Sequence, residues 1–328
     1  MPWTLAELSK IEVDPLRKSV IDTMLMEASL LELVPWETIG ALSTRVVTYD
    51  SLPSFGYRKV NEAFAESTGK FKGKTENISL GGLDIDTDKA IARAKNTIAD
   101  ARAIQQQMAL KAAAYHFNWK FIAGNPGSDP EEFKGLRLRV DDVYTEGFTD
   151  QKFAGSATTH GILSTQALRF DFIQDLDKLI YSIKGHSPDC LLMNKKMLLA
   201  TRSCLIREKL LNNAQDMFGR NIDVYGGVRL IDIGVRADQT TEIILNSETS
   251  AGAASGGDAN SYTSIYAVKF AIGEYLWGIQ EYPMEVEDLG ELQTAPVYRT
   301  RVDWPHGLAD VDPRCIARMY GVIASSAA

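Results

Sequence analysis

The stretch DTDKAIARAKNTIADARAIQQQMALKAAAYHFNWKF, residues 86–121, decides the fold of this chain. It contains neither glycine nor proline, and alanine, the strongest helix former, recurs throughout it. Apolar or neutral side chains recur in alternating steps of three and four, which predicts one long helix with a single stripe. The stripe positions are 91, 94, 98, 101, 105, 108, 112, 115 and 119, and Gln105 is its one polar exception.

The signals at both ends of this stretch agree with a helix. Asp84, Asp86 and Asp88 supply N-terminal caps and the charge that suits a helix dipole, and Gly124 and Pro126 end the helix. At about 1.5 Å per residue a helix over residues 87–121 is on the order of 50 Å long. A compact domain of this size does not need such length, so we expect a strut that supports the body.

Two segments before the helix have little to pack against themselves. Residues 1–45 are interpreted as an extended N-terminal arm with a short amphipathic helix that begins at Pro15 and runs to about Leu31. The apolar residues ahead of that helix are Trp3, Leu5, Leu8 and Ile11. We expect them to contact a neighbouring molecule.

Residues 46–86 predict a projecting loop. Val46–Tyr49 and Ile78–Leu80 are strand-like, and the stretch between them is polar and punctuated by glycine. Its expected tip, residues 69–74, holds Lys70, Lys72 and Lys74 around Phe71. A loop longer than about 15 residues without a core of its own is usually functional or disordered. The sequence therefore predicts a long β-hairpin loop with a basic tip.

Beyond the long helix, strands and helices alternate. The patterns predict helices at 172–183 and 195–211, a Gly/Ala/Ser-rich surface loop at 249–261, and strands at 136–140, 190–194, 228–233, 242–245, 265–272 and 297–304. In the last strand Tyr298, Thr300, Val302 and Trp304 share one face. These elements favour an α+β chain.

Composition excludes several classes of protein. The chain has 328 residues, 45% hydrophobic and 24% charged, which is ordinary globular usage. Its net charge of −8 provides no basic field for DNA phosphates, which disfavours a DNA-binding structural protein. Residues 1–15 do not resemble a signal peptide, and no apolar run approaches the ~20 residues that span a bilayer, so we expect no membrane partner.

No set of residues predicts catalysis, a cofactor or a metal. Cys190, Cys204 and Cys315 are widely spaced without a C-x-x-C pair, which indicates reduced, buried thiols. His160 lies near Ser156, but no G-x-S-x-G motif accompanies them. A homo-oligomeric metabolic enzyme therefore stays a weaker hypothesis, because no acid–base or cofactor set converges.

An acidic run near the C-terminus has two interpretations. It comprises Glu281, Glu285, Glu287, Asp288 and Glu291. Such a run is typical of a solvated face, but it also fits a contact surface for a basic partner, and the lysine-rich loop of another subunit is its natural complement. The candidate inter-subunit contact residues are Trp3, Leu5, Leu8, Ile11, Lys70, Phe71, Lys72, Lys74, Glu285, Glu287, Asp288 and Glu291.

The order of these parts resembles a known family. Phe133-Lys134-Gly135-Leu136 is similar to the turn that follows the family's spine helix, and residues 190–196 are similar to its strand-to-helix segment ending in Met-Asn-x-x. Residues 225–228 resemble its strand entry, with Gly227 where proline is often found. The chain thereby resembles the major capsid proteins of tailed double-stranded DNA bacteriophages, which have the Hong Kong-phage capsid fold.

The resemblance implies a division of the chain. It implies an N-terminal arm (1–45), an extended β-hairpin loop (46–86), a peripheral domain with the spine helix (87–140 and 265–328) and an axial α/β domain (141–264). It also implies a function: a non-enzymatic major capsid protein whose pentamers and hexamers form an icosahedral shell around the viral genome. The expected location is the virion, with assembly in the host cytoplasm.

The resemblance implies partners as well. The chain lacks a long charged helical segment before the arm, which implies a separate scaffolding protein or a processed start; a portal and a decoration protein are further expected partners. Packaged double-stranded DNA would be near the shell without specific contacts. Some relatives cross-link a loop lysine to a neighbour, but no acid or acceptor can be assigned here. The alternative within the same fold is an encapsulin-type bacterial compartment.

Overall fold

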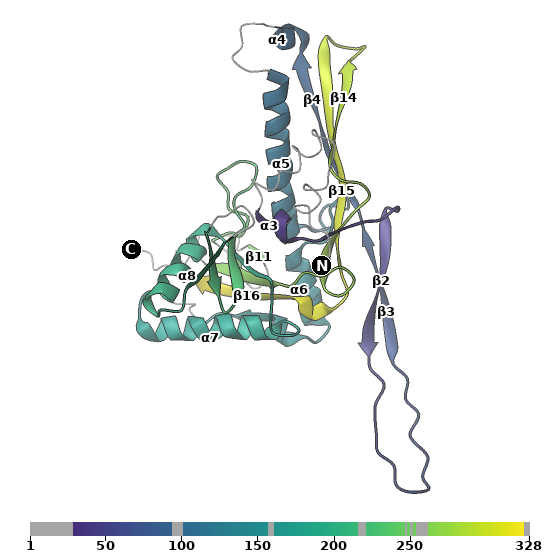
Figure 1. Cartoon of the computed structure of the whole chain (residues 1–328), viewed down its shortest axis with the longest axis vertical. Coiled ribbons are helices and arrows are strands. Elements are labelled where there is room, and N and C mark those ends of the chain that lie inside the picture. The colour runs from purple at the N-terminus through teal and green to yellow at the C-terminus, as the bar shows by residue number, and fades with distance from the viewer. Residues whose placement is uncertain are drawn as a thin grey trace.

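The computed structural model describes residues 29–93, 101–156, 161–215, 221–246, 248–249, 252–253 and 262–324. Figure 1 shows a body from which two structures extend in opposite directions. One is a pillar made of helix α5 and long strands, and the other is a narrow β-hairpin. The predicted arm residues Trp3, Leu5, Leu8 and Ile11 lie outside the described residues.

The long helix exists, but its start and its buried face differ from the prediction. Strand β4 (Ser79–Asp88) and the short helix α4 (Lys89–Arg93) precede α5 (Ala101–Ala123). Residues 94–100 lie outside the described part, so a continuous helix from α4 into α5 stays a prediction. The start is wrong because residues 79–88 pair with another strand over their whole length.

The core-facing stripe of α5 is Leu110, Ala114, Phe117 and Phe121, which are all buried. The predicted stripe is wrong, because Gln105 and Met108 are exposed and Ala112, Tyr115 and Trp119 are only half-buried. Alanines on every side leave this helix with two nearly equivalent apolar stripes. The two phenylalanines decide between them, because aromatic side chains bury the most apolar area.

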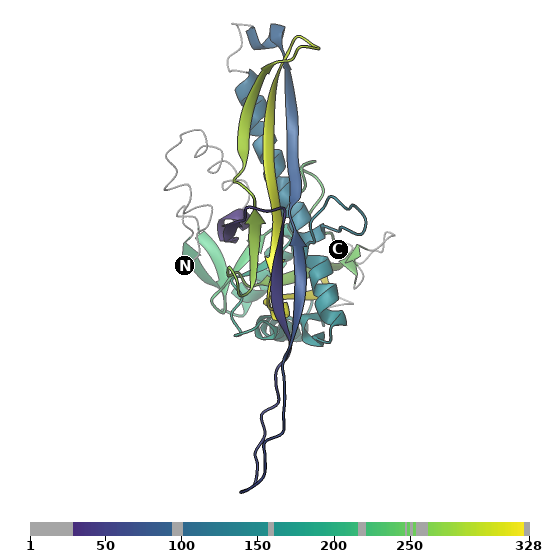
Figure 2. The same ribbon diagram turned by 90° about the vertical axis from the view of Figure 1, so that its right-hand side faces the viewer.

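One sheet forms the pillar beside α5. Its path is β1 (Trp36–Thr38), β13 (Leu276–Gln280), β15 (Val297–Asp310) and β14 (Glu285–Glu291), and β4 pairs with β15. The predicted alternation in β15 is confirmed, since Thr300, Val302 and Trp304 are buried while Arg301 is exposed. Figure 2 shows β4, β15 and β14 running side by side along the pillar.

A second, seven-stranded sheet forms the body. Its order is β5 (Lys152–Ala154), β16 (Ile316–Ile323), β12 (Tyr262–Val268), β6 (Cys190–Met193), β9 (Val228–Asp232), β8 (Asn221–Tyr225) and β7 (Asn212–Gln215). Helices α7 (Gln166–Ser182) and α8 (Lys195–Arg207) pack against it; Thr165 and Asn194 cap them by accepting a backbone hydrogen bond. The predicted strands at 190–194, 228–233 and 265–272 and both helices are confirmed with shifted ends.

Two predicted strands are wrong. Residues 136–140 begin helix α6 (Leu136–Thr145), in which Leu136, Val140 and Val143 are buried at helical spacing. Five alternating residues fit either element, and the continuation to Val143 decides for a helix. Residues 242–245 contribute an isolated bridge between Glu242 and Val235 rather than a strand. The remaining short elements are α3 (Ser29–Leu33), η1 (Thr149–Gln151), η2 (Pro313–Cys315), β10 (Glu248–Thr249) and β11 (Gly252–Ala253).

The predicted projecting hairpin is confirmed. Strands β2 (Ser43–Ser51) and β3 (Lys70–Asn77) pair antiparallel, with Val47 opposite Gly73. Figure 2 shows the hairpin continuing from the lower end of the long strands, away from the pillar. Residues 52–69 connect the two strands at the far end.

Aromatic side chains fill the junction of pillar and body. The Phe117 ring lies 5.5 Å from that of Trp36, 5.3 Å from that of Trp304 and 6.3 Å from that of Phe133, centroid to centroid. The cluster joins α5 to strands from both ends of the sequence. The pillar is therefore anchored on this packed core, whereas Val46 and Ile78 at the base of the hairpin belong to a separate small cluster.

Candidate assembly surfaces

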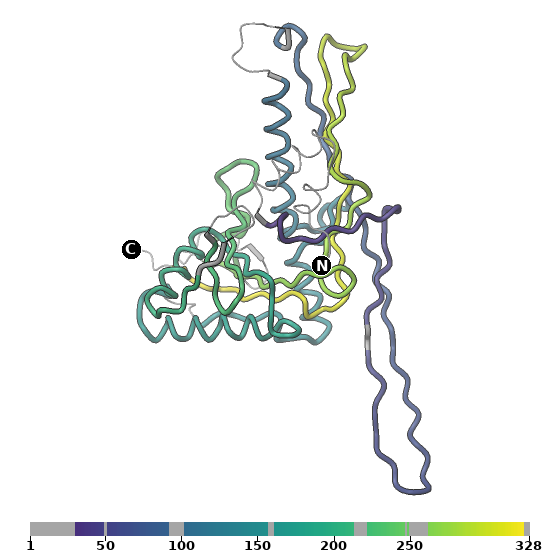
Figure 3. The backbone as a smooth tube through the Cα atoms, viewed as in Figure 1, coloured from purple at the N-terminus to yellow at the C-terminus, as the bar shows by residue number. Residues whose placement is uncertain are grey.

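The far end of the hairpin carries exposed apolar side chains. Residues 52–69 are almost all exposed, and Tyr57 retains 96% of its accessible surface. The other exposed large apolar residues there are Leu52, Phe55, Val60 and Phe64. Figure 3 shows that this end of the backbone lies farthest from the body. Apolar surface gathered on a projecting end is typical of a site of contact with another molecule.

Within this end of the hairpin the contacts are local. The Phe55 and Tyr57 rings meet edge-on with centroids 5.8 Å apart, and the Arg58 guanidinium lies 5.0 Å from the Phe64 ring centroid. Ser54 donates its backbone N–H to Ser67 Oγ at 2.7 Å. The end is therefore bridged across its two sides but rests on no part of the body described here.

The lysines do not form the tip, and this part of the prediction is wrong. Lys70, Phe71, Lys72 and Lys74 belong to β3, which pairs with β2. Lys70 and Phe71 are exposed, Lys72 forms an ion pair with Glu146, and Lys74 is half-buried. Glycines at 69 and 73 suggested a turn, whereas the turn lies within residues 52–69. Whether these side chains contact a neighbouring subunit is still a prediction.

A buried ion-pair cluster lies where the hairpin meets the body. Arg139 donates from Nη1 and Nη2 to the two carboxylate oxygens of Glu76, at 2.8 and 2.9 Å. Lys74 Nζ lies 2.7 Å from Asp310 Oδ1 and 2.8 Å from Glu76 Oε1, and Arg139 also pairs with Asp310. We call Lys74, Glu76, Arg139 and Asp310 the joint cluster.

Electrostatics explain the protonation of the joint cluster. Burial alone would raise the pKa of Glu76, but the charge of Arg139 and its hydrogen bonds hold that pKa below its usual value. Burial, and then the charge of Arg139, lower the pKa of Lys74. Beside the cluster, burial and the charges of Lys74 and Arg139 lower the pKa of Lys134 to about 8.

Four residues of the predicted acidic run, Glu285, Glu287, Asp288 and Glu291, lie on β14, at the other end of the molecule from the hairpin tip (Figure 1), whereas Glu281 precedes this strand. Glu291 and Asp288 have cationic partners in their own chain. Glu291 pairs with Lys89 at 2.5 Å, and Asp288 pairs with Arg102 at 2.7 Å. Glu285 and Glu287 lie in the same strand, opposite Asp303 and Arg301 of β15. These pairs lie within one chain, so the contact of this surface with a basic neighbouring subunit stays a prediction.

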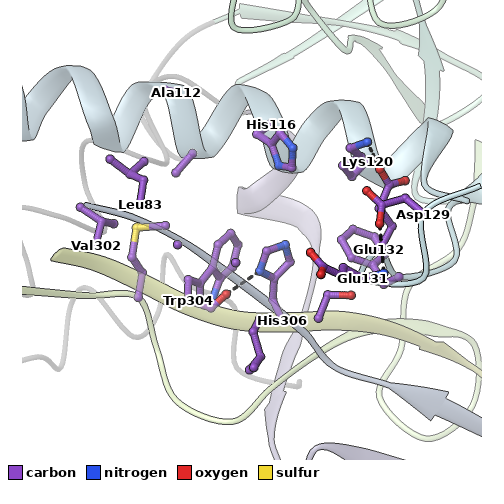
Figure 4. Close-up of a pocket in the computed structure, with 17 residues that line it drawn as sticks. Leu83, Ala112, His116, Lys120, Asp129, Glu131, Glu132, Val302, Trp304 and His306 are labelled. Atoms are coloured by element: carbon purple, nitrogen blue, oxygen red, sulfur yellow. Dashed lines mark hydrogen bonds and ion pairs between the residues drawn. The ribbon is translucent and has the colours of Figure 1, made fainter. Parts of the chain in front are cut away.

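Figure 4 shows the pocket between α5 and strands β4 and β15, which has a volume of about 450 Å³. His116 lies on its helix side and His306 on its strand side. His306 Nδ1 is 2.8 Å from the backbone oxygen of Trp304, which assigns the proton to Nδ1 as a donor. Burial lowers the pKa of His306 to about 4 and also lowers that of His116.

The pocket does not have the features of an active site. Its remaining polar members include Lys120 and Glu132, which pair with each other, and its walls are largely apolar. Both imidazoles are neutral near pH 7, because burial disfavours their charged forms. Among the described residues no group of three His, Cys, Asp or Glu side chains has a metal-binding arrangement. We interpret the pocket as a packing gap between α5 and the strands β4 and β15.

The cysteines are buried, as predicted. Burial raises the pKa of Cys204 to about 11 and that of Cys315 to about 12, and it also raises that of Cys190. Such thiols are protonated and poor nucleophiles. Ser156 donates to Asp175, while His160 lies outside the described residues. None of the described helices has the length and apolar character needed to cross a membrane.

Sequence comparison finds one family. The family model of the major capsid protein GP7 matches residues 15–164. No curated protein matches the chain. The matched range contains the hairpin, α5 and α6, which are the parts that distinguish this architecture.

Solved structures share the architecture along nearly the whole chain. The holo-SrpI encapsulin complex of Synechococcus elongatus PCC 7942 is 14% identical, with TM-score 0.60 and coverage of 90% of this chain and 88% of that one. The capsid of a native GTA particle is 14% identical, with TM-score 0.59 and 90% coverage of both chains. Mycobacterium phage Cain is 11% identical, with TM-score 0.55 and full coverage of both chains. At such identities the likeness shows a shared fold.

Proposed function

We propose, from the premise that this chain is a major capsid protein of the Hong Kong-phage fold, that its copies assemble into an icosahedral shell around double-stranded DNA. The family match over residues 15–164 and the fold shared with phage and GTA capsids support the premise. The proposed role is structural and non-catalytic.

The observation that carries the proposal is the exposed apolar end of the hairpin. Phe55 and Tyr57 retain 88% and 96% of their accessible surface in the segment that connects β2 and β3, at the end of a strand pair that projects away from the body. A soluble monomer gains nothing from such a structure, because exposed aromatic surface favours aggregation. In a closed, symmetric assembly every copy can bury this surface on a neighbour.

The two sheets are the basis for the proposed assignment of residues to an axial and a peripheral domain. Residues 141–264 form most of the axial domain, around which pentamers and hexamers would close. Strands β12 and β16 are hydrogen-bonded into the same seven-stranded sheet, so we assign them to the axial domain as well. The remainder of 87–140 and 265–328, together with β4, forms the peripheral domain, and residues 1–45 and the hairpin reach neighbouring subunits.

Further partners belong to the same proposal. A shell that packages DNA requires an entry portal, and we propose a separate scaffolding protein as another partner. A decoration protein on the outer face is a further partner. The net charge of −8 suits a wall that packaged DNA touches without specific binding. We place the finished protein in the virion and its assembly in the host cytoplasm.

The encapsulin-type compartment is the second candidate function. It is favoured by the TM-score of 0.60 to an encapsulin, which exceeds the 0.55 found for phage Cain. The family match to a phage protein favours the virus. The content of the particles distinguishes the two functions: DNA packaged through a portal, or a protein cargo.

Electron microscopy of the purified full chain tests the proposal. We expect closed polyhedral shells, or rings of five and six subunits if a scaffold is required for closure. A uniform population of small oligomers without rings or shells would contradict the proposed function. Shells that take up a co-expressed protein cargo and never DNA would favour the compartment.

A further inference from the structure

The hairpin joins the rest of the molecule at one narrow place. Strands β3 and β4 are separated only by Ile78, yet β3 pairs with β2 while β4 pairs with β15. The chain therefore changes partners at this residue. Among the described residues, the hairpin strands beyond the joint form backbone pairs only with each other, and Lys72 also links them to the body through an exposed ion pair with Glu146. The buried contacts at the joint therefore set the direction of the hairpin.

One anchor at the joint is apolar. Val46 and Ile78 are buried against Trp277, Ile279 and Ala309. Such contacts hold the base of the hairpin to the body. The hydrophobic effect is not directional, however, so two small apolar side chains restrict a rotation of the hairpin only weakly.

The other anchor is the joint cluster, and it is directional. Arg139 is 2% exposed and lies on α6, while its two hydrogen bonds to Glu76 reach across to the hairpin. The same guanidinium donates to the backbone oxygens of Leu308 at 2.8 Å and Lys134 at 3.0 Å. A planar guanidinium with both edges occupied fixes the orientation of its carboxylate partner as well as its distance.

Lys74 adds a second link from the same strand. It bonds Asp310 of β15 at 2.7 Å, so β3 is tied to both α6 and β15. The cluster contains two cations and two anions, and its charge balances. Buried ion pairs are weak evidence for stability, because desolvation offsets their attraction, but they can select one geometry among several.

We infer that Arg139, through Glu76, is the positioning residue that fixes the direction of the hairpin relative to the body. The apolar anchor keeps the hairpin attached, and the joint cluster selects one angle. The consequence for assembly rests on the proposed shell function: a hairpin held at one angle presents residues 52–69 to a neighbour at no further ordering cost. The angle of the hairpin is a property of the single chain and does not depend on assembly.

Electron–electron double resonance between two spin labels tests this inference in the full chain. Tyr57→Cys places one label at the hairpin end and Tyr181→Cys places the other on α7; both side chains are exposed, at 96% and 64%. The three natural cysteines are buried and do not compete for the label. The parent protein should give one narrow distance distribution.

The variants separate geometry from stability. Glu76→Gln with Arg139→Met removes one cation and one anion, so the Lys74–Asp310 pair stays balanced and folding is preserved. We expect the distance distribution to broaden several-fold while far-UV circular dichroism is unchanged. Arg139→Lys keeps the positive charge, but an ammonium lacks the planar fork of a guanidinium. Its distance distribution should therefore be narrower than that of the double variant and broader than that of the parent. Arg169→Met is the matched control, since it breaks the 2.8 Å Arg169–Glu208 pair inside the body.

Each outcome decides the inference. A distribution as narrow in the double variant as in the parent overturns it, as does equal broadening in Arg169→Met. Should the double variant fail to fold, Arg139→Lys alone gives the test, and an unchanged distribution then overturns the inference. Shell formation is recorded separately by microscopy. If the distance distribution broadens in the double variant but the parent protein forms no shells, the inference about Arg139 stands and the proposed shell function is contradicted.

Discussion

His306 and Trp304 lie two residues apart on β15, with their rings stacked at a centroid separation of 4.1 Å and an interplanar angle of 23°. Side chains at this spacing share one face of a strand. The same imidazole donates from Nδ1 to the Trp304 backbone oxygen, 2.8 Å away. Phe117 and Phe133 meet the ring at centroid distances of 5.5 and 5.3 Å. An imidazole enclosed in this way is expected to stay neutral.

The first prediction is a loss of stability in acid through His306. Its pKa falls from 6.5 in the unfolded chain to about 4 in the folded protein, because burial disfavours the cation. Between these values the unfolded state binds a proton that the folded state does not. The contribution of neutral His306 to the free energy of unfolding is therefore complete above pH 6.5. It is lost as the pH falls towards 4, and the loss reaches about 3 kcal/mol.

Urea unfolding from pH 4 to 8 measures this effect. In His306→Phe the free energy of unfolding should fall less steeply between pH 6.5 and pH 4 than it does in the parent protein. His186→Gln, which alters an exposed histidine, is the control and should leave this fall unchanged. An identical fall in the parent protein and His306→Phe would show that other groups govern acid denaturation.

The second prediction tests which face of α5 packs on the core. Phe117→Ala should cost about 3–5 kcal/mol of stability, because a fully buried aromatic ring leaves a cavity among five other rings. Met108 is 59% exposed, so Met108→Ala should change stability by less than about 0.5 kcal/mol. Thermal unfolding of both variants measures the difference. Equal effects would mean that the helix is rotated from the orientation described here.

The third prediction concerns the two lysines at the ends of the stretch first interpreted as a basic tip. Lys74→Glu would place a third carboxylate beside Glu76 and Asp310 with Arg139 as the one cation left in the cluster, and should cost about 3–5 kcal/mol. Lys70→Glu, at an exposed position, should cost less than about 0.5 kcal/mol. Chemical denaturation compares them. A stable Lys74→Glu variant would argue against the buried cluster.

The fourth prediction concerns the exposed end of the hairpin. Phe55, Tyr57 and Phe64 make local contacts only, so changing all three to serine should leave the free energy of unfolding within about 1 kcal/mol of the parent. Shell formation should fall sharply, because the apolar area that a neighbour buries is removed. Light scattering and electron microscopy measure assembly. Normal shells from this folded variant would show that the hairpin end is not an assembly contact.

The sequence predicted the order of the parts better than their faces. A long Gly- and Pro-free stretch dictates a helix whatever surrounds it, and so α5 was predictable. Its orientation was not, because Ala112 and Ala114 fit a core almost equally and only the tertiary contacts of Phe117 choose between them. Residues 136–140 were mistaken for a strand, because five alternating residues satisfy both periods.

The joint cluster could not be predicted from spacing. Glu76 and Arg139 are 63 residues apart, and Asp310 comes from the last long strand, so no local pattern connects them. One signal was present, since Lys74 and Glu76 point to the same face of a strand. Alternation of that kind is common on exposed hairpins, and burial was needed to distinguish it. The aromatic residues at 55, 57 and 64 carry no local signal of exposure, because the sequence alone does not distinguish an exposed aromatic side chain from a buried one.

The last prediction concerns the N-terminal arm, whose residues Trp3, Leu5, Leu8 and Ile11 lie outside the described part of the chain. Leu30, Leu31 and Val34 are fully buried, so the body holds the chain from α3 onward, and we expect it to fold without residues 1–14. In an ordinary globular protein, deleting those residues should be nearly neutral. In a shell the arm would lie along a neighbour and bury apolar area worth about 25 cal/mol per Å² before ordering costs.

Deletion of residues 1–14 should therefore leave soluble subunits with unchanged thermal stability while closed shells become rare. A variant with Trp3, Leu5, Leu8 and Ile11 changed to serine keeps the length of the arm and should behave in the same way, which separates apolar burial from a need for chain length. Light scattering followed by electron microscopy measures both variants against the full chain. Shells at the parent yield from either variant would mean that the apolar side chains of the arm take no part in assembly, and the hairpin would then have to supply the contact between subunits.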